Sequence, residues 1–322
     1  MSAITMDKQI AVEDSFAQAV VEGLSQQQKT IPARYFYDQA GSELFEEITR
    51  LPEYYPTRTE IGLLRDHAGD IARLTGTGRT VVEFGSGSSA KTPLLLGAVH
   101  PASYVPIDIS GHFLELSAQA FAREHDHIQV LPITADFTHP VRLPAMVNGP
   151  LIGFFPGSTI GNFAPAGAID LLRSFRATLG AEARLVIGVD LRKNVRMLEA
   201  AYDDAAGVTA QFNLNLLARI NRELGGTIPL DAFTHRAVWH DGRGRIEMHL
   251  EAQRDVHFRA AGTNFTMRAG ETIHTENSHK YSLEEIRLLA RASGWEPMAS
   301  WCDANRYFSI HVWSADDGRM EP

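Results

Sequence analysis

A short strand followed by a glycine-rich turn constrains this chain more than any other feature. Residues 81–84 are apolar apart from Glu83, and they lead into Gly85-Ser86-Gly87. Residues 92–98 beyond the turn have the character of a helix start. Because glycine has no Cβ, a ligand can lie against the main chain where the strand ends. The pattern predicts a strand, a turn and a helix in a sheet that binds a nucleotide-like ligand.

The residues of the turn discriminate between kinds of nucleotide site. A Walker loop requires Gly-Lys-Ser/Thr, but Lys91 follows Ala90. A dinucleotide fingerprint G-x-G-x-x-G has Ala90 in its last position, a tolerated variant, so NAD binding stays open. The turn more closely resembles the first motif of class I S-adenosylmethionine (SAM) methyltransferases, E-x-G-x-G-x-G, with Ser89 in place of the last glycine. A glycine turn that only connects strand to helix is the alternative without a ligand.

Charge and composition limit the partners. The chain has a net charge of -9, and its 30 Lys and Arg residues form no run. Nucleic-acid binding needs concentrated positive charge, so we expect a small-molecule substrate and no nucleic acid. The apolar runs are too short to span a bilayer and the first residues lack a signal-peptide core, so we expect no membrane partner. A single cysteine, Cys302, excludes an internal disulfide, and we expect a cytoplasmic monomer.

Acidic residues follow two further predicted strands. Residues 103–110 form a strand that contains Asp108. An acid at this place in such a sheet accepts the two hydroxyls of a ribose, although Asp108 could equally cap the following helix. A third strand, over residues 128–134, leads to Asp136 and Phe137. Their carboxylate and ring could take the amino group and the face of an adenine.

The next predicted strand leads to a loop at the same edge of the sheet. Residues 151–155 are an unbroken apolar run, typical of a parallel strand covered on both faces. The loop after this run contains Asn162, and a fifth strand is predicted over residues 185–189. Ligands of open α/β sheets bind at the carboxyl ends of the strands. Asn162 is therefore expected to face the reactive end of a donor molecule.

The pattern changes after residue 193. Apolar residues at helical spacing predict one long helix over residues 196–224. Strand-like runs separated by short turns then predict a small antiparallel sheet, with strands over residues 236–240, 245–254, 257–265 and 271–274. The chain closes with a helix over residues 282–293 and strands over residues 295–301 and 306–313.

The first part of the chain is rich in tyrosine. A helix is predicted over residues 12–24 and a helical pattern over residues 60–73. Half of the 8 tyrosines lie between them, at Tyr35, Tyr37, Tyr54 and Tyr55. Packing of this segment onto a core would explain them. A tyrosine can also line a pocket, with its ring on apolar atoms and its hydroxyl on a polar group.

Several short motifs are spread over nearly the whole chain. They are Tyr35-Phe36-Tyr37-Asp38, Leu51-Pro52-Glu53-Tyr54-Tyr55-Pro56-Thr57-Arg58, the glycine turn with Lys91-Thr92, Gly157-Ser158-Thr159-Ile160-Gly161-Asn162, Ala201-Tyr202-Asp203-Asp204, Arg245-Ile246-Glu247-Met248 and Thr275-Glu276-Asn277-Ser278-His279-Lys280. In this order they resemble the histidine-specific Nα-methyltransferases of ergothioneine biosynthesis. The resemblance implies a SAM-dependent enzyme that methylates the α-amine of L-histidine three times and releases hercynine.

The resemblance also implies the domain organisation. The fold class is α/β, with a Rossmann-like class I SAM-dependent methyltransferase domain and a second, smaller α+β substrate-binding domain. The methyltransferase domain is expected over residues 60–195 plus 282–322. The N-terminal segment, residues 1–59, is expected to join residues 196–281 in the substrate-binding domain. A chain of 322 residues is long enough for two such cores.

The same resemblance assigns substrate residues. Asn162 and Tyr202 would hold the substrate carboxylate, since an amide N–H and a phenol O–H are both donors. Glu276 and Ser278 would hold the imidazole, because residues two apart in an extended segment face the same side. On sequence alone, Glu276 could instead form a surface ion pair with Lys280. The remaining substrate positions implied are Tyr54 near the imidazole, Tyr37 near the amine, and Phe45, Met248 and Gly157. Tyr37, Asn162 and Tyr202 are the implied catalytic residues, but no feature singles out a general base, and a water path is as good a candidate as Tyr37.

The cofactor residues follow from the resemblance as well. For SAM these are Gly85, Lys91, Asp108, Asp136 and Phe137. Lys91 would meet the methionine carboxylate, although by its position alone it is an ordinary exposed lysine at a helix start.

Metal ligands are not expected from the spacing of the histidines. The 13 histidines form neither H-x-x-x-H nor H-E-x-x-H, and His125 and His127 fall in a charged turn. Ser89, Asn277 and Tyr281 differ from the expected motifs or flank them. These differences leave room for another aromatic amino acid or a histidine derivative as substrate. A SAM-binding protein without catalysis is the remaining alternative.

Overall fold

The chain divides into two compact units. The computed structural model describes residues 16–87 and 90–315, so Ser89 and the first residues of the helix predicted over 12–24 lie outside the described residues. Unit 1 consists of the described parts of Met1–Tyr54 and Asn194–Asn277, and unit 2 of those of Tyr55–Lys193 and Ser278–Pro322. Each boundary lies a few residues before the predicted one. At the first boundary the reason is that helix α3 begins at Tyr55 and packs on the sheet of unit 2.

An eight-stranded, mostly parallel sheet forms the centre of unit 2. Its strand order is β13-β14-β7-β6-β2-β3-β4, with β5 also paired to β3. All pairs among the strands β2 to β7 are parallel. β14 pairs antiparallel with both β7 and β13. The strands are β2 (Thr80–Phe84), β3 (Ser103–Asp108), β4 (Gln129–Val130), β5 (Ile133–Thr134), β6 (Leu151–Phe155), β7 (Arg184–Asp190), β13 (Glu296–Cys302) and β14 (Phe308–Ser314).

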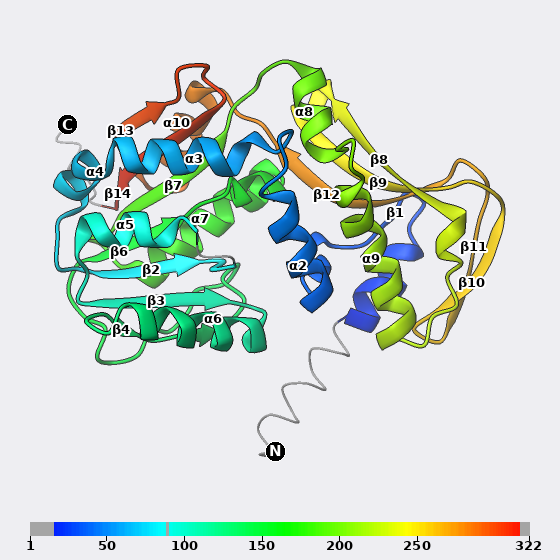
Figure 1. Cartoon of the computed structure of the whole chain (residues 1–322), viewed down its shortest axis with the longest axis horizontal. Coiled ribbons are helices and arrows are strands. Elements are labelled where there is room, and N and C mark those ends of the chain that lie inside the picture. The colour runs from blue at the N-terminus through cyan, green and yellow to red at the C-terminus, as the bar shows by residue number, and fades with distance from the viewer. Residues whose placement is uncertain (1–15, 88–89, 316–322) are drawn as a thin grey trace. The chain divides into compact units, whose positions relative to one another are not determined.

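Helices cover both faces of this sheet. α3 (Tyr55–Asp66), α4 (Ala68–Thr75) and α5 (Thr92–Val99) pack on one face, and α7 (Pro165–Leu179) and α10 (Leu283–Ala292) on the other (Figure 1). α6 (Gly111–Glu124) lies along β3 and β4. Neighbouring residues of β6 pack on opposite faces of the sheet. Ile152 belongs to the core beneath α3, α4 and α5, and Leu151 belongs to the core beneath α7 and α10. This alternation explains why β6 is apolar throughout, as predicted for a strand buried on both faces.

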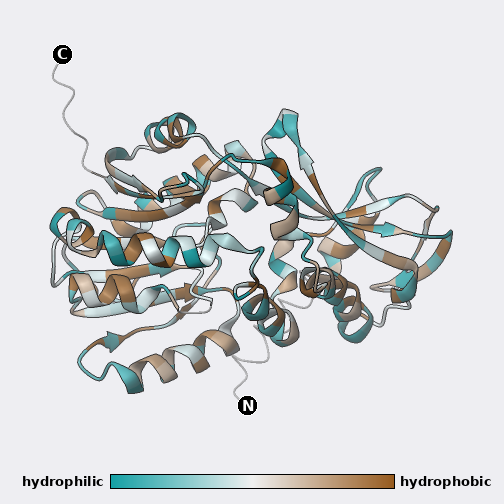
Figure 2. Cartoon of the chain, turned by 45° about the horizontal axis from the view of Figure 1, so that its top comes forward, coloured by the Kyte–Doolittle hydropathy of each residue, from teal (hydrophilic) through white to brown (hydrophobic). Residues whose placement is uncertain are grey.

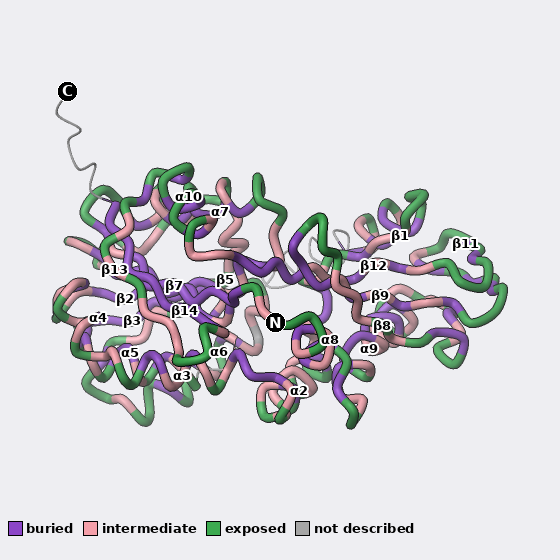
Figure 3. The backbone as a smooth tube through the Cα atoms, turned by 90° about the horizontal axis from the view of Figure 1, so that it is seen from above, coloured by how far each residue is buried: buried purple, intermediate pink, exposed green. Residues whose placement is uncertain are grey.

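Hydropathy and burial follow the same layers. Figure 2 shows hydrophobic residues along the central strands of unit 2, and Figure 3 shows that β7 and β14 are buried. None of the helices within residues 16–87 and 90–315 is long and apolar enough to cross a membrane.

Two predicted elements of unit 2 are divided in the structure. The strand predicted over residues 128–134 forms two short strands, β4 and β5, because Pro132 between them has no N–H to give to a ladder. The helical pattern predicted over residues 60–73 belongs to α3 and α4, which meet at His67. Neither division changes the order of the sheet.

The chain changes direction across the sheet at β2. From β2 it proceeds through β3 to β4 on one side, and then returns to β6 and β7 on the other. Ligands of doubly wound sheets bind at the carboxyl ends of the strands beside such a reversal. The turn after β2 lies at this edge, and Gly85 has a φ of 76°, a backbone conformation that other residues rarely adopt.

Unit 1 combines a four-stranded sheet with helices. The sheet has the order β1-β12-β9-β8, and a separate hairpin consists of β10 and β11. β8 and β9 are antiparallel, as predicted, whereas β1 runs parallel to β12. α8 and α9 pack on β8 and β9, and α2 packs on α9. The elements are β1 (Lys29–Thr30), α2 (Gln39–Ile48), α8 (Val195–Tyr202), α9 (Val208–Glu223), β8 (Phe233–His240), β9 (Arg245–Ala252), β10 (Val256–Ala260), β11 (Thr263–Met267) and β12 (Thr272–His279).

Short 3-10 turns connect several of these elements. Those in the N-terminal and inserted segments are η1 (Ala33–Phe36), η3 (Leu230–Ala232) and η4 (Asp241–Arg243). In unit 2, η2 (Thr159–Asn162) follows β6. Residues 16–24 are helical, which agrees with the described part of the helix predicted over 12–24.

Two predictions for unit 1 are wrong in detail. The single helix predicted over residues 196–224 is two helices: α8 ends at Tyr202, and Asp204 accepts the backbone N–H groups of Val208 and Thr209 at the start of α9. The strand predicted over residues 257–265 is the hairpin of β10 and β11, which turns at Ala261 and Gly262. The spacing of apolar residues alone does not reveal where one helix ends and another begins, or where a tight turn divides a strand.

Candidate active site

A chain of aromatic rings links several predicted substrate residues in unit 1. The ring centroids of Tyr37 and Phe45 are 5.7 Å apart, those of Phe45 and Tyr54 are 6.2 Å apart, and those of Tyr54 and Tyr202 are 6.3 Å apart. Each pair meets edge to face, the arrangement that the ring quadrupole favours. Tyr37 follows η1, Phe45 lies on α2, Tyr54 precedes α3 and Tyr202 ends α8. The tertiary fold therefore brings together four residues that the motifs assigned separately.

Phe212 on α9 supports this row of rings and was not predicted. It is buried, and its centroid lies 5.8 Å from Tyr37 and 6.0 Å from Phe45. The ring of Phe36 also packs on Phe212, with the centroids 4.6 Å apart. In the sequence Phe212 is one of many apolar residues at helical spacing, so only its tertiary neighbours distinguish it.

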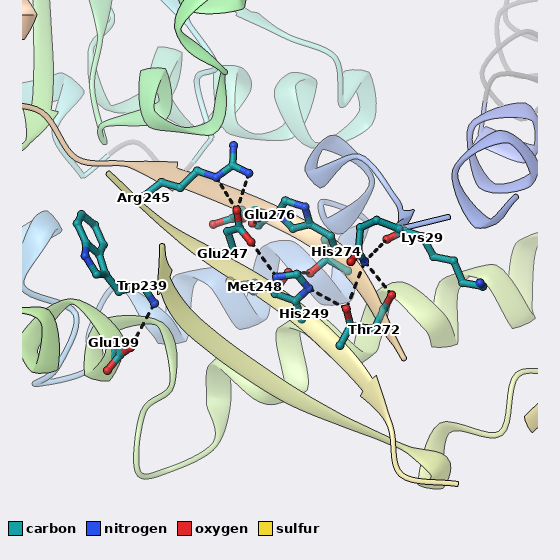
Figure 4. A network of polar contacts seen from close by, with 12 residues as sticks. Lys29, Glu199, Trp239, Arg245, Glu247, Met248, His249, Thr272, His274 and Glu276 are labelled. Carbon is teal, nitrogen blue, oxygen red and sulfur yellow. Dashed lines mark hydrogen bonds and ion pairs between the residues drawn. The ribbon is translucent and has the colours of Figure 1, made fainter. Parts of the chain in front are cut away.

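Met248 and Glu276 lie on two strands of the unit 1 sheet. Met248 of β9 is buried, and the hydroxyl of Thr275 donates to its carbonyl at 3.1 Å. Glu276 of β12 is partly buried, and its carbonyl lies 3.0 Å from Nε2 of His274. Figure 4 shows both residues within the polar network around these strands.

In unit 2, the predicted residues Asn162 and Ser278 come from segments that touch. Nδ1 of His279 lies 2.8 Å from the carbonyl of Gly161. A Cβ on Gly161 would lie 2.8 Å from the carbonyl of His279 and 3.5 Å from the hydroxyl of Ser278, so only glycine permits this approach. Asn162 is the next residue of the same turn, η2. The fold thus holds the turn of Asn162 against the segment of Ser278.

Buried charges lie behind Ser278. Nζ of Lys280 lies 2.8 Å from the Ser278 hydroxyl oxygen and 2.7 Å from Asp190. Asp190 also pairs with Lys193 and accepts from the hydroxyl of Tyr55 at 2.7 Å. Lys280 is only 1% exposed, so it is not the surface residue that the alternative for Glu276 assumed. Lysine has no acceptor, so the Ser278 oxygen accepts from it.

The ionisation of this cluster depends on burial and on the charges of its neighbours. Burial opposes the ionised form of Asp190, but Lys280 and Lys193 outweigh it, so the pKa of this carboxyl lies below its ordinary value. Burial also lowers the pKa of Lys193 to about 8, against the attraction of Asp190. The cluster therefore keeps a charged carboxylate in the interior of unit 2, held by cationic neighbours.

The predicted cofactor residues gather at the carboxyl edge of the unit 2 sheet. Asp108 ends β3 and Asp136 follows β5, and these two strands are paired. A Cβ on Gly85 would lie 3.5 Å from the ring of Phe137, so the turn after β2 and this ring are neighbours. Burial raises the pKa of Asp108, while backbone and hydroxyl donors at Ser110 oppose that rise. An acid, a bare glycine turn and an aromatic ring at one edge match the ribose, main-chain and adenine contacts expected for SAM.

Asp108 and Asp136 also organise their own loops. Asp108 accepts the backbone N–H of Ser110 at 2.8 Å. Asp136 accepts the N–H and the hydroxyl of Thr138 at 2.9 Å and 2.6 Å. Asp108 is therefore not the N-cap of α6, because that position is occupied by Ser110 and the carboxylate accepts the N–H of Ser110 itself. These bonds leave further lone pairs on each carboxylate.

Lys91 pairs with a glutamate that was not predicted. Its Nζ lies 2.6 Å from Glu60 of α3, and Glu60 also accepts the backbone N–H of Gly157 at 2.9 Å. The Lys91 side chain is 14% exposed and Glu60 1%, so Lys91 is not an ordinary exposed lysine. Glu60 thereby connects the glycine turn after β2 with the loop after β6. An acid on the apolar face of a predicted helix, in register with Leu63 and Leu64, was the signal that could have revealed it.

A second buried glutamate lies at the end of β2. Glu83 accepts from the hydroxyl of Tyr104 at 2.5 Å and from that of Thr92 at 2.9 Å. Burial raises the pKa of Glu83 to about 7, although both hydroxyls oppose the rise. These bonds fix the start of α5 against β2 and β3, and so position the glycine turn.

Comparisons with known proteins identify the family. A family model described as histidine-specific, SAM-dependent methyltransferase matches residues 16–315. The chain is 40% identical over 310 residues to a histidine N-alpha-methyltransferase of Mycolicibacterium smegmatis, with 93% of this chain and 96% of that protein covered. It is 39% identical over 300 residues to a histidine N-alpha-methyltransferase of Mycobacterium tuberculosis, with 91% and 92% covered. It is also 31% identical to ergothioneine biosynthesis protein 1 of Neurospora crassa over 88% of this chain, which spans 33% of that larger protein.

The family match and the fold agree. The matched region includes segments of both units, the glycine turn and the row of aromatic residues. The predicted α/β class I methyltransferase fold is confirmed, as is the prediction that the chain is an enzyme of this type. The chain belongs to the family of histidine-specific, SAM-dependent methyltransferases.

Proposed function

We propose that this protein transfers methyl groups from SAM to the α-amine of L-histidine three times and releases hercynine, a step in ergothioneine biosynthesis. The names of its relatives support this proposal. The observation that carries it is the row of rings formed by Tyr37, Phe45, Tyr54 and Tyr202. A wall of aromatic faces and phenol hydroxyls suits a substrate that is polar at first and becomes a permanent cation.

The reaction requires mainly that the protein positions the amine against the methyl group. SAM supplies a methyl group bound to a sulfonium, and in each transfer an N–C bond forms while the C–S bond breaks. The amine must be neutral to attack, so one proton leaves the nitrogen before each transfer. Aligning the amine lone pair with the methyl carbon and excluding water is the contribution that a protein can make to such a displacement. We assign Tyr37 to the surroundings of the amine, with a water path as an equally good route for the proton.

Aromatic rings also suit the growing charge of the substrate. The methylated nitrogen ends as a quaternary ammonium, which is attracted to ring faces but cannot donate a hydrogen bond. Tyr37 and Phe45 would form this surface, with Phe212 behind them. A carboxylate in the same place would bind the product more tightly and slow its release.

The two ends of histidine need different partners. We assign the substrate carboxylate to the phenol of Tyr202 and the amide of Asn162, both of which donate. We assign the imidazole to Glu276, Ser278 and Tyr54, with Met248 and Gly157 nearby. A carboxylate that accepts the imidazole N–H discriminates against ligands without that donor, because they leave a charge unpaired.

SAM itself is assigned to the carboxyl edge of the unit 2 sheet. Asp108 would accept the ribose hydroxyls, Asp136 the adenine amino group, and Phe137 would flank the adenine. Gly85 leaves room for the donor beside the main chain. Lys91 would meet the methionine carboxylate, and its pairing with Glu60 holds its ammonium beside Gly157 in the meantime.

Mass spectrometry of the purified protein with SAM and L-histidine tests the proposal directly. Mono-, di- and trimethylated histidine should appear in succession, and methylation should stop at three groups on the α-nitrogen. If histidine is not methylated but another aromatic amino acid is, the substrate assignment is wrong. If SAM binds and no amino acid is methylated, the chain is a SAM-binding protein without catalysis.

A single substitution tests the imidazole assignment. Glu276→Ala should raise the KM for histidine by roughly tenfold or more, because one charge-assisted hydrogen bond is lost, while the affinity for SAM stays unchanged. Glu271→Ala is the matched control, since Glu271 precedes the same strand, is exposed and pairs with Lys29 at 3.6 Å. An unchanged KM in the Glu276 variant, measured by steady-state kinetics, would remove this residue from the imidazole site.

A further inference from the structure

Two histidines and a glutamate meet on the sheet of unit 1, although no spacing rule connects them. Glu247 and His249 lie on β9 and His274 on β12, and one side-chain donor atom of each lies within 4.8 Å of the others. Burial alternates along β9, with Met248 buried and its two neighbours partly exposed. Glu247 and His249 therefore lie on the face of the strand opposite Met248. Figure 4 shows the three side chains in one polar network.

The three groups have the ionisation states of metal ligands near neutral pH. Burial lowers the pKa of both His249 and His274 below its ordinary value, so each imidazole is neutral and keeps a lone pair. Burial opposes ionisation of Glu247, but hydrogen bonds from Arg245 and His249 outweigh it and lower its pKa to about 2. Two neutral imidazoles and one carboxylate are a ligand set that suits a divalent transition metal.

One distance within the cluster is already that of two ligands on one ion. Nε2 of His249 lies 3.2 Å from a carboxylate oxygen of Glu247. Two such ligands bound to one zinc ion at near-tetrahedral angles are about 3.3 Å apart. The two imidazole rings are nearly parallel, with centroids 4.7 Å apart and an interplanar angle of 17°. To bind a shared ion, the rings would have to turn about their side-chain bonds so that their ligand atoms, which lie within 4.8 Å of each other, come closer together.

Neighbouring groups orient the rings in the way that metal-bound histidines require. Nε2 of His274 lies 3.0 Å from the carbonyl of Glu276, which only accepts, so this nitrogen carries the proton. The other nitrogen of His274 keeps the lone pair. Nδ1 of His249 lies 3.2 Å from the hydroxyl of Thr272 and would donate to it in the tautomer that binds the ion, in which Nε2 exchanges its hydrogen bond to Glu247 for the metal. Such partners on the second ring nitrogen are the usual support of a metal ligand.

We propose that Glu247, His249 and His274 bind one divalent transition-metal ion, with Zn²⁺ as the best match. The site would join β9 to β12, two residues before Glu276. Glu247 and His249 also line an open hollow of about 470 Å³ together with Trp239 and Asp241, which leaves space for a water or another ligand in the fourth position.

Nearby arginines oppose the ion and set its affinity. Arg245 contacts one oxygen of Glu247 at 2.5 Å, and His249 faces the other oxygen. Arg236 also repels positive charge at His249, and it pairs with Glu251 at 3.1 Å. Removing the charge of Arg236 should therefore tighten metal binding. A purely structural histidine pair would not respond to that charge in this way.

Calorimetric titration of the full, untagged chain with Zn²⁺, after stripping with a chelator, tests the site. We expect one ion per chain. His249→Gln and His274→Gln should each weaken binding by roughly tenfold or more, because a ligand bond is lost. His257→Gln, which changes an exposed histidine of β10, is the matched control and should bind as the unaltered chain does.

Two further measurements protect the test against misfolded variants. Addition of Co²⁺ to the unaltered chain should give the visible absorption bands of a Co²⁺ ion with nitrogen ligands. Subsequent addition of Zn²⁺ should displace the Co²⁺ and remove these bands. Arg236→Gln should bind Zn²⁺ more tightly than the unaltered chain. The proposal is overturned if the unaltered chain binds no ion, or if both histidine variants retain its stoichiometry and affinity.

Discussion

At the scale of single residues, buried charges in this protein are held by several partners each. Asp190 is fully buried and contacts Lys280, Lys193 and the hydroxyl of Tyr55. Lys280 is the most deeply buried of these cations and also holds Ser278. Removing one partner of a buried ion pair leaves a charge without compensation, which costs far more than losing an exposed pair.

Lys280→Met tests the energetic weight of this cluster. We expect the free energy of unfolding of unit 2 to fall by about 3 kcal/mol, because Asp190 stays buried with fewer donors. The measurement is urea denaturation followed by tryptophan fluorescence, since Trp295, Trp301 and Trp313 all belong to unit 2.

The control for this prediction is an exposed ion pair of the same unit. Arg291 and Glu296 lie 3.2 Å apart with more than half of each side chain exposed. Arg291→Met should change stability by no more than about 0.5 kcal/mol. Equal losses in the two variants would contradict the role assigned to Lys280.

Phe212 tests whether the aromatic row depends on support from behind. Phe212→Leu should lower kcat/KM for histidine by roughly tenfold, because Tyr37 and Phe45 lose a packing partner and shift. Phe258→Leu is the matched control, since Phe258 is similarly buried but packs on Phe233 and Phe265. Both variants should lose similar stability in a thermal melt, and only the Phe212 variant should lose activity. Equal activity in the two would remove Phe212 from the support of the site.

At the scale of elements, strand β14, which lies between β13 and β7, carries a titratable group into the core. All residues of β14 are buried, and His311 lies there with Nε2 2.8 Å from the hydroxyl of Ser309. Burial lowers the pKa of His311 to about 4. Its ordinary value is about 6.5, so the unfolded chain takes up a proton that the folded chain does not bind until lower pH.

This difference predicts acid sensitivity. Because the unfolded state binds more protons between about pH 6.5 and 4, the stability of unit 2 should fall as pH decreases through that window, by about 3 kcal/mol from this residue. His311→Gln removes the titration and should flatten this part of the profile. The check is the difference between the two proteins in urea denaturation at several pH values. Parallel profiles would show that His311 does not titrate differently in the two states.

The helices of unit 1 show how local chemistry overrides periodicity. Apolar spacing runs through residues 196–224, but Asp204 accepts the first N–H groups of α9 and separates it from α8. Tyr202 therefore lies at the end of a helix, next to the Asp204 loop, rather than in the middle of one. This position brings its ring to Tyr54.

At the scale of the whole molecule, the chain passes three times between two units. Unit 1 takes the N-terminal segment and the insertion, and unit 2 takes the segments between and after them. Neither unit is a continuous piece of sequence. β14 and β13, which complete the unit 2 sheet, come from the last part of the chain. Each unit therefore acquires its full sheet only after the distant segments have joined.

The sequence by itself determined most of the strands and the family. Apolar runs and alternation mark the strands of both sheets, and the glycine turn marks the edge where a nucleotide-like donor would lie. The motifs around Tyr37, Tyr54, Tyr202 and Glu276 point to the histidine-specific methyltransferases. These signals are local, because strand and helix periods and turn chemistry depend on neighbouring residues.

Only the tertiary structure decided which distant residues meet. Glu60 pairs with Lys91, Lys280 with Asp190, and His274 lies beside Glu247 and His249. Periodicity at any one of these positions is compatible with a solvated side chain. The partner is fixed by strand order, register and packing of elements far apart in the chain, so the chemistry of each cluster follows from the fold and not from local spacing.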